Sequence, residues 1–111
     1  MTETEFLVLA DVTLREIEMA MDNAAAAAGL DIECTLSGNV LEIELVDNGS
    51  KILINSQVPM QEIWVAAKTG GFHFKRQANQ WIDTRDGTQL FAALSRVASA
   101  QAGCAMTLAS V

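Results

Sequence analysis

The spacing of apolar residues changes twice along the chain and limits the folds open to it. Over residues 3–28 apolar residues recur every three or four positions, as on one face of an α-helix. From Leu30 to Asp83 apolar and polar residues mostly alternate, as in half-buried β-strands, and near residue 90 the helical spacing returns. The order helix, strands, helix predicts an α+β domain.

Turn signals divide the alternating stretch into about six strands. Ser37-Gly38-Asn39 and Asp47-Asn48-Gly49-Ser50 are typical of hairpin turns, and Gly70-Gly71 precedes a further strand. Short connections of this kind join antiparallel neighbours. We predict a two-layer α+β sandwich, with two helices packed on one face of an antiparallel sheet and the other face in water. The strands are expected near residues 32–36, 41–45, 52–54, 62–68, 72–76 and 80–83.

Both helices have candidate start and stop residues. For the first, Thr2 or Thr4 can cap the N-terminus and Gly29 can end the helix. The second is expected to begin after Asp86 or Thr88 and to end before Gly103. The apolar face of the first helix is predicted to hold Phe6, Leu9, Ala10, Thr13, Ile17, Ala20, Met21 and Ala24.

The length and the N-terminus favour one cytoplasmic domain. The 111 residues suffice for a single core, so we expect one domain over residues 1–111. The longest apolar run, residues 24–30, has seven residues, against the ~20 that a bilayer span needs. The first five residues carry two acids and no base, unlike a signal peptide. We therefore expect neither export nor a membrane partner.

Negative charge is concentrated in the first part of the chain. The formal net charge is −7, but residues 1–47 hold eleven acids and one base, Arg15, while the remainder carries a net positive charge. Such asymmetry attracts cations or a basic partner and repels phosphates, which argues against nucleic acid as a partner. The alternative is an acidic solvated surface that only aids solubility.

A row of carboxylates on the first helix is the first candidate site. Asp11, Glu18 and Asp22 fall within about 40° of one another, on the side opposite the apolar face. Asp31 and Glu33 would extend the row if the first strand lies at the sheet edge beside this helix. Carboxylates suit hard cations such as iron, calcium, manganese or magnesium, yet residues a turn apart do not enclose an ion. Such a site would be open and weak, and an ordinary solvated helix face is the alternative.

Trp64 is the second candidate. Alternation places Ile63 and Val65 on one face of their strand and Trp64 on the other. If the first pair faces the helices, Trp64 lies on the open sheet face, where a tryptophan on a rigid strand is typical of an interface anchor. Asn55 and Gln57 share one parity and could lie beside it. The alternative is that Trp64 only covers its own sheet.

The sequence carries no familiar catalytic motif. GxSxG, P-loop, GxGxxG and HExxH patterns are absent, and the single histidine, His73, cannot anchor a multi-histidine metal site. Cys34 shares the parity of Ile32 and Leu36 and is expected to be a small core residue; a disulfide with Cys104 is not favoured, although the sequence alone leaves it open. Trp81 could be core or surface. We do not expect an enzyme.

Several stretches resemble the bacterial frataxin (CyaY) family. They are residues 48–59 (NGSKILINSQVP), 63–68 (IWVAAK) and 70–74 (GGFHF). Shorter matches at residues 5–11, 31–34 and 101–103 fit the same pattern, in collinear order over nearly the whole chain.

This resemblance implies a fold, a cargo and partners. Frataxins have two helices on one face of an antiparallel sheet. They bind iron weakly on an acidic ridge of the first helix and first strand. They also bind the cysteine desulfurase and the scaffold protein of iron–sulfur cluster assembly and modulate that reaction. In this chain the ridge corresponds to Glu3, Glu5, Asp11, Glu18, Asp22, Asp31 and Glu33. The partner-binding sheet surface corresponds to Asn55, Gln57 and Trp64.

One departure from the family pattern bears on iron. Many bacterial relatives have a dense run of acids where the first helix ends, whereas here Asn23 precedes five alanines, and Leu7 replaces a histidine often seen in the first turn. We therefore expect fewer or weaker sites for ferrous or ferric iron. The leading hypothesis is a monomeric, non-enzymatic modulator of cluster assembly, with iron-driven oligomerisation left open. The alternative is a ferrous iron chaperone or store, and iron oxidation by the ridge is the least favoured role.

Overall fold

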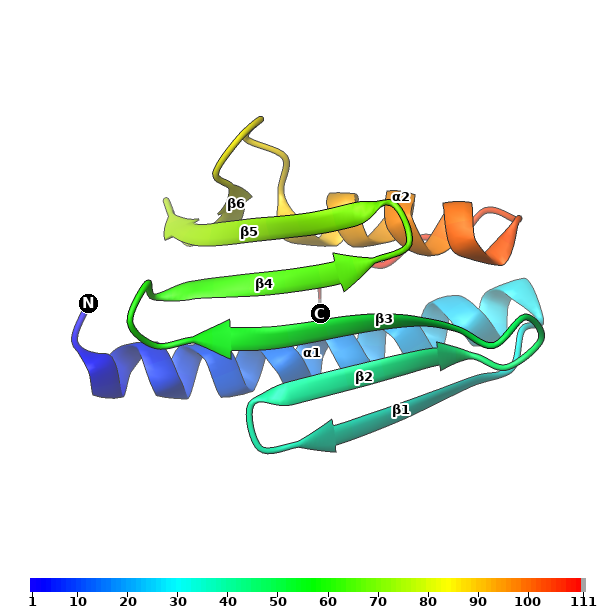
Figure 1. Cartoon of the computed structure of the whole chain (residues 1–111), viewed down its shortest axis with the longest axis horizontal. Coiled ribbons are helices and arrows are strands. Elements are labelled where there is room, and N and C mark those ends of the chain that lie inside the picture. The colour runs from blue at the N-terminus through cyan, green and yellow to red at the C-terminus, as the bar shows by residue number, and fades with distance from the viewer. Residues whose placement is uncertain (111) are drawn as a thin grey trace.

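The computed structural model describes residues 1–110, so Val111, the last residue of the expected domain, lies outside the described residues. Over residues 1–110 the sheet follows the chain order β1-β2-β3-β4-β5-β6, and every neighbouring pair is antiparallel. Figure 1 shows the sheet in front and both helices behind it. The predicted two-layer α+β fold is confirmed. The elements are α1 (Glu3–Ala28), β1 (Ile32–Ser37), β2 (Val40–Leu45), β3 (Ser50–Gln57), β4 (Glu62–Ala67), β5 (Gly70–Gln77), β6 (Gln80–Asp83) and α2 (Leu90–Ala102).

Both ends of α1 are fixed by local hydrogen bonds. The Glu5 backbone N–H donates to Thr2 Oγ1 at 3.1 Å, and the Thr2 backbone N–H donates to Glu5 Oε1 at 2.9 Å. This reciprocal pair is a capping box. The helix ends at Gly29, whose φ of 69° lies in the left-handed region that glycine adopts without steric cost. The predicted cap Thr2 and stop Gly29 are confirmed.

The core lies between the sheet and the apolar faces of the two helices. The buried face of α1 follows the prediction with three differences, because Leu14 and Ala25 are also buried and Leu9 is only half-buried. Trp81, which the sequence left open, is a core residue with 2% of its surface exposed. Its Nε1–H donates to Thr13 Oγ1 at 2.9 Å, and this bond ties the middle of α1 to β6.

The start of α2 differs from the prediction. The cap is Gln89, whose Oε1 accepts hydrogen bonds from the backbone N–H groups of Phe91 and Ala92. The expected caps Asp86 and Thr88 are wrong, because the chain stays non-helical through Gln89. Gln89 forms a bridge with Ile82, and this keeps the chain extended up to the helix. Asp86 instead accepts a hydrogen bond from the Thr88 N–H in the preceding turn.

After Gly103 the chain turns back along α2. The Ser99 hydroxyl bonds to the backbone of Met106, and the Ser95 hydroxyl accepts from the N–H of Leu108. Met106 and Leu108 are buried. This tail therefore completes the core, although no periodic pattern in its sequence predicts its burial.

Candidate functional site

The acidic residues of α1 lie beside the sheet edge. The strand order places β1 at the edge, and α1 packs against β1, β2 and β3, as the sequence analysis required. Asp22 Oδ1 lies 3.8 Å from the Cys34 thiol of β1. The row therefore borders the apolar face on its β1 side, and the expectation that Asp22 lies opposite that face is wrong. Asp11 and Asp22 are exposed, and Glu18 is half-buried.

Glu33 of β1, together with Asp31 directly before the strand, lies across the edge from the acids of α1. Ile32 and Cys34 are half-buried and face the helix, while Asp31 and Glu33 are exposed. Side chains alternate along a strand, so Glu33 projects from the open face, where it is the register partner of Glu44 on β2. The edge strand thus separates the two sets of predicted ridge residues.

The ridge is also long. Glu3 lies 19 residues before Asp22 on one helix, which separates them by about 28 Å along the axis. The Glu5 carboxylate is engaged in the capping box, and the hydrogen bond from the Thr2 backbone N–H lowers the pKa of this carboxyl. Asp11 pairs with Arg15 at 3.1 Å, and both side chains are exposed.

These distances limit how iron can be held. Among residues 1–110, no three His, Cys, Asp or Glu side chains come together as a group that could hold a metal ion. Carboxylate oxygens suit iron chemically, but an ion on this ridge would keep most of its water. The geometry therefore fits open, weak sites rather than an enclosed centre.

Cys34 is protonated in the metal-free chain at neutral pH. Burial, followed by the nearby charges of Asp22 and Glu18, raises the pKa of the Cys34 thiol to about 12. The side chain is half-buried between β1 and α1, so the expectation of a full core residue is only partly right. Cys104 is exposed, and both Cys34 and Cys104 are free thiols in the structure.

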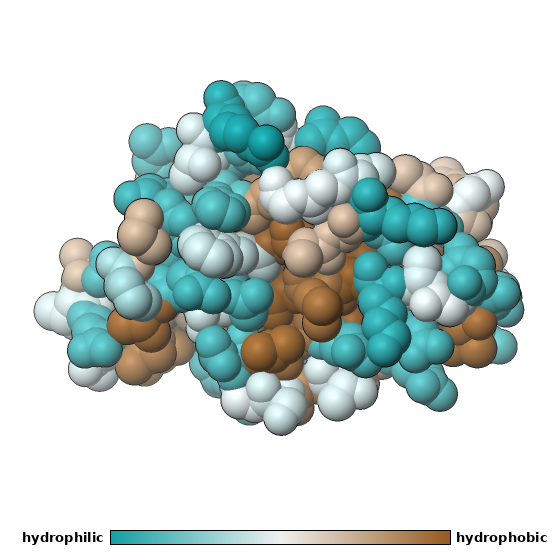
Figure 2. All heavy atoms as spheres, viewed as in Figure 1, coloured by the Kyte–Doolittle hydropathy of each residue, from teal (hydrophilic) through white to brown (hydrophobic). Residues whose placement is uncertain are grey.

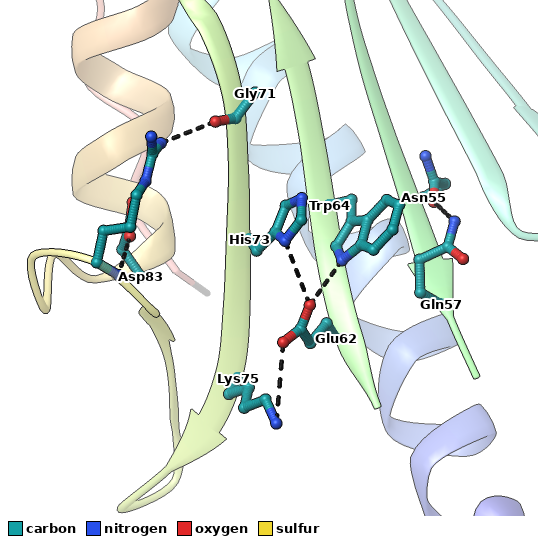
Figure 3. Close-up of polar contacts among 9 residues, drawn as sticks. Asn55, Gln57, Glu62, Trp64, Gly71, His73, Lys75 and Asp83 are labelled. Carbon is teal, nitrogen blue, oxygen red and sulfur yellow. Dashed lines mark hydrogen bonds and ion pairs between the residues drawn. The ribbon is translucent and has the colours of Figure 1, made fainter. Parts of the chain in front are cut away.

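The second surface lies on the open face of the sheet. Asn55, Trp64 and His73 are direct register neighbours on β3, β4 and β5. The Trp64 and His73 rings stack with centroids 4.3 Å apart and an interplanar angle of 6°. Gln57 donates from Nε2 to Asn55 Oδ1 at 2.6 Å, and Figure 3 shows these side chains on one face. The structure thus brings together the three residues predicted for partner binding.

Glu62 is a member of this surface that sequence reasoning missed. Its side chain is only 5% exposed although it belongs to the open face. Oε1 accepts a hydrogen bond from Trp64 Nε1–H at 2.7 Å and lies 3.5 Å from His73 Nδ1, and Oε2 lies 3.9 Å from Lys75 Nζ. Figure 3 shows the carboxylate between these three side chains. Glu62 shares the parity of Trp64, and this was the available sequence signal. We name Asn55, Gln57, Glu62, Trp64 and His73 the Trp64 platform.

The Trp64 platform is surrounded by apolar residues and by charged side chains. Val40 lies beside Asn55, and Leu53 beside Ala66, on the same face. Figure 2 shows apolar surface exposed near the middle of this face, among hydrophilic residues. Acidic side chains flank the platform on β1 and β2, and Lys75 flanks it on β5. The flanking acids thus lie on the β1–β2 side of this face, where Lys51 of β3 pairs with Glu42 at 3.6 Å.

Comparison with known proteins identifies the family. The model of the frataxin-like domain matches residues 1–104. This chain belongs to the frataxin family. It is 61% identical, over 97% of its length and 96% of the relative, to the iron–sulfur cluster assembly protein CyaY of Janthinobacterium sp. (strain Marseille).

Solved frataxin structures share the fold described above. A frataxin from Psychromonas ingrahamii superposes with a TM-score of 0.81 at 26% identity, covering 99% of this chain and all of that one. Trimeric frataxin from the yeast Saccharomyces cerevisiae, in complex with ferrous iron, gives a TM-score of 0.69 at 26% identity and covers 82% of each chain. No helix in residues 1–110 of this frataxin-family chain is long and apolar enough to cross a membrane.

Proposed function

We propose that this chain is an iron-binding modulator of iron–sulfur cluster assembly that acts in the cytoplasm. It docks on the cysteine desulfurase and its scaffold protein and is not itself an enzyme. The observation that carries the proposal is the arrangement of two separate surfaces on one small domain, the acidic α1–β1 edge and the Trp64 platform. The CyaY relative that is 61% identical is named for iron–sulfur cluster assembly, which supports the same role.

The acidic edge supplies attraction to a basic partner and weak binding of iron. Residues 1–47, which form α1, β1, β2 and the turn that follows, carry eleven of the fourteen acids. Their summed field steers a basic desulfurase toward this side of the molecule. Ferrous or ferric iron on the same carboxylates reduces their charge and so alters or competes with docking. The ridge residues in this role are Glu3, Glu5, Asp11, Glu18, Asp22, Asp31 and Glu33.

The Trp64 platform supplies the specific contact with the desulfurase–scaffold complex. Trp64 is half-buried and held by its hydrogen bond to Glu62, so little side-chain freedom is lost when a partner covers it. Asn55 and Gln57 present amide groups beside the indole ring, which fix the orientation of a partner. In the absence of iron we propose that the chain is a monomer.

The test is the affinity of the iron-free chain for its own cysteine desulfurase across a salt series. We expect micromolar-range binding that weakens as salt rises. A variant that neutralises the α1 acids (Asp11→Asn, Glu18→Gln, Asp22→Asn) should bind more weakly at low salt. A control that adds the same charge elsewhere carries lysine at the exposed positions Thr69, Ala92 and Ala100.

The control should retain more affinity than the α1 variant if the acids of α1 make the contact. Equal losses in both would mean that only net charge matters and would remove the proposed docking surface. Absence of binding at low salt would reject docking and favour the iron chaperone or store, which competition with a ferrous chelator would then measure.

A further inference from the structure

The outer side of α1 carries an apolar stripe that the fold does not use. Val8, Val12 and Met19 are 62%, 45% and 54% exposed, which is unusual for large apolar side chains on a well-packed helix. Their spacing of four and seven residues places them within about 40° of one another around the helix axis. They form a line about 16 Å long that points away from the sheet.

Carboxylates border this stripe on both sides. Helical geometry places Asp11, Glu18 and Asp22 along the flank toward β1, and Glu5 and Glu16 along the other flank. Arg15 falls within the line, but its Nε bonds to Asp11 Oδ2 at 3.1 Å, which draws the guanidinium toward one flank. The outer face of α1 is therefore an apolar line between two acidic rows.

This charge pattern selects the occupant. A second copy of the chain would bring the same acidic rows together, an anionic lipid surface would face them with lipid phosphates, and a nucleic acid would do so with its backbone. A protein segment with apolar side chains in line and lysine or arginine on both sides complements the face in both respects. A basic amphipathic helix meets this description.

We propose that the outer face of α1 docks a basic amphipathic helix of the partner, with Val8, Val12 and Met19 as its apolar anchors. The inference rests on the proposed docking of the acidic edge and adds a component that salt does not screen. Electrostatic contacts between exposed groups weaken as the Debye length shortens, whereas burial of apolar surface does not. Part of the affinity should therefore persist at high salt.

The test replaces the three anchors with glutamine (Val8→Gln, Val12→Gln, Met19→Gln) and measures the affinity of the iron-free chain for its own cysteine desulfurase. Glutamine favours helices at least as well as valine, and the replaced side chains are exposed, so the fold should be kept. The matched pair is Val12→Gln against Val46→Gln, because Val46 is 43% exposed in the turn after β2. Measurements are made at low salt and at about 1 M, where the Debye length is ~3 Å.

We expect the triple variant to bind at least about tenfold more weakly at both salt concentrations, and Val46→Gln to bind as the parent chain does. Equal affinity of the triple variant and the parent would overturn the stripe while leaving the acidic docking intact. Sedimentation of the parent chain at about 1 M salt should show a monomer; a dimer that the triple variant loses would assign the stripe to a second copy instead. Absence of any binding by the parent at low salt would reject the proposed function and this inference together.

Discussion

The hydrogen bond between Trp81 and Thr13 offers a direct measure of how firmly α1 is fixed to the sheet. Thr13 is 4% exposed and Trp81 is 2% exposed, and the donor and acceptor are 2.9 Å apart. The Thr13 hydroxyl also donates to the carbonyl of Leu9 at 2.8 Å. Thr13→Val keeps the shape of the side chain but removes the acceptor, and so leaves the Trp81 N–H in the core without its partner.

A buried donor without a partner costs about 1–3 kcal/mol. Burial of the added methyl group offsets part of this cost, because each buried CH₂ contributes about 0.8 kcal/mol. We therefore expect Thr13→Val to lower the free energy of unfolding by about 1–2 kcal/mol, although it makes the core more apolar. Thr4→Val, an exposed substitution in the same helix, should change it by less than about 0.5 kcal/mol.

Urea unfolding of Thr13→Val, Trp81→Phe and the double variant completes a thermodynamic cycle. Trp81→Phe removes the donor, so Thr13→Val should cost less in that background, with a coupling energy of about 1 kcal/mol. The dependence of the unfolding free energy on urea should keep its slope, which shows that the folded and unfolded states are otherwise unchanged. Additive single effects, or a Thr13→Val variant as stable as the parent, would refute this account of the bond.

Three further results are expected. Glu62→Ala should weaken desulfurase binding, because Trp64 loses the acceptor that orients its ring. Glu62→Gln keeps an acceptor and should retain most of the affinity. Equal losses of affinity in the two variants would show that the carboxylate charge matters rather than the positioning of the ring. Gly29→Ala should lower the free energy of unfolding by about 1–2 kcal/mol in thermal or urea melts, because a side chain at φ 69° is strained. Gly71→Ala, at a position without a positive φ, should be tolerated. Equal losses of unfolding free energy in the two variants would contradict this explanation. The pKa of about 12 keeps the Cys34 thiol protonated in the folded chain at pH 9, so its alkylation should be much slower in the folded chain than in urea. Because the ordinary pKa is 9.0, the unfolded chain loses this proton first, and the free energy of unfolding should fall as the pH rises from about 9 toward 12. Cys34→Ala should not show this fall.

The sequence predicted the elements of the fold because their periodicity is strong. Apolar and polar residues alternate most clearly in β1 and β2, and the alternation of side chains along β4 put Trp64 on the face opposite Ile63 and Val65. Alternation gives the face of a residue but not whether neighbouring side chains cover it. Glu62 shows this limit, since its burial depends on Trp64, His73 and Lys75 from two strands.

Other features depended on contacts between distant segments. Gln89 caps α2 because its backbone is bridged to Ile82, a pairing that local preferences for Asp or Thr caps cannot reveal. The acids of the predicted ridge are spread along α1 and across β1. Only one face of α1 contacts β1 and only one face of β1 contacts α1, so acids on the other faces stay apart. A projection around one helix axis could not show that Asp22 meets Cys34.

The position of β1 at the edge of the sheet has a consequence for how the chain avoids aggregation. An edge strand offers unpaired backbone N–H and C=O groups to any other extended chain. Here Glu33 lies within that strand, Asp31 directly precedes it, and Asp22 stands beside it on α1, so a second β1 that approached would bring like charges together. The carboxylates of the proposed ridge therefore also act as gatekeepers against strand-to-strand polymerisation, and a cation that neutralises them would lower that barrier.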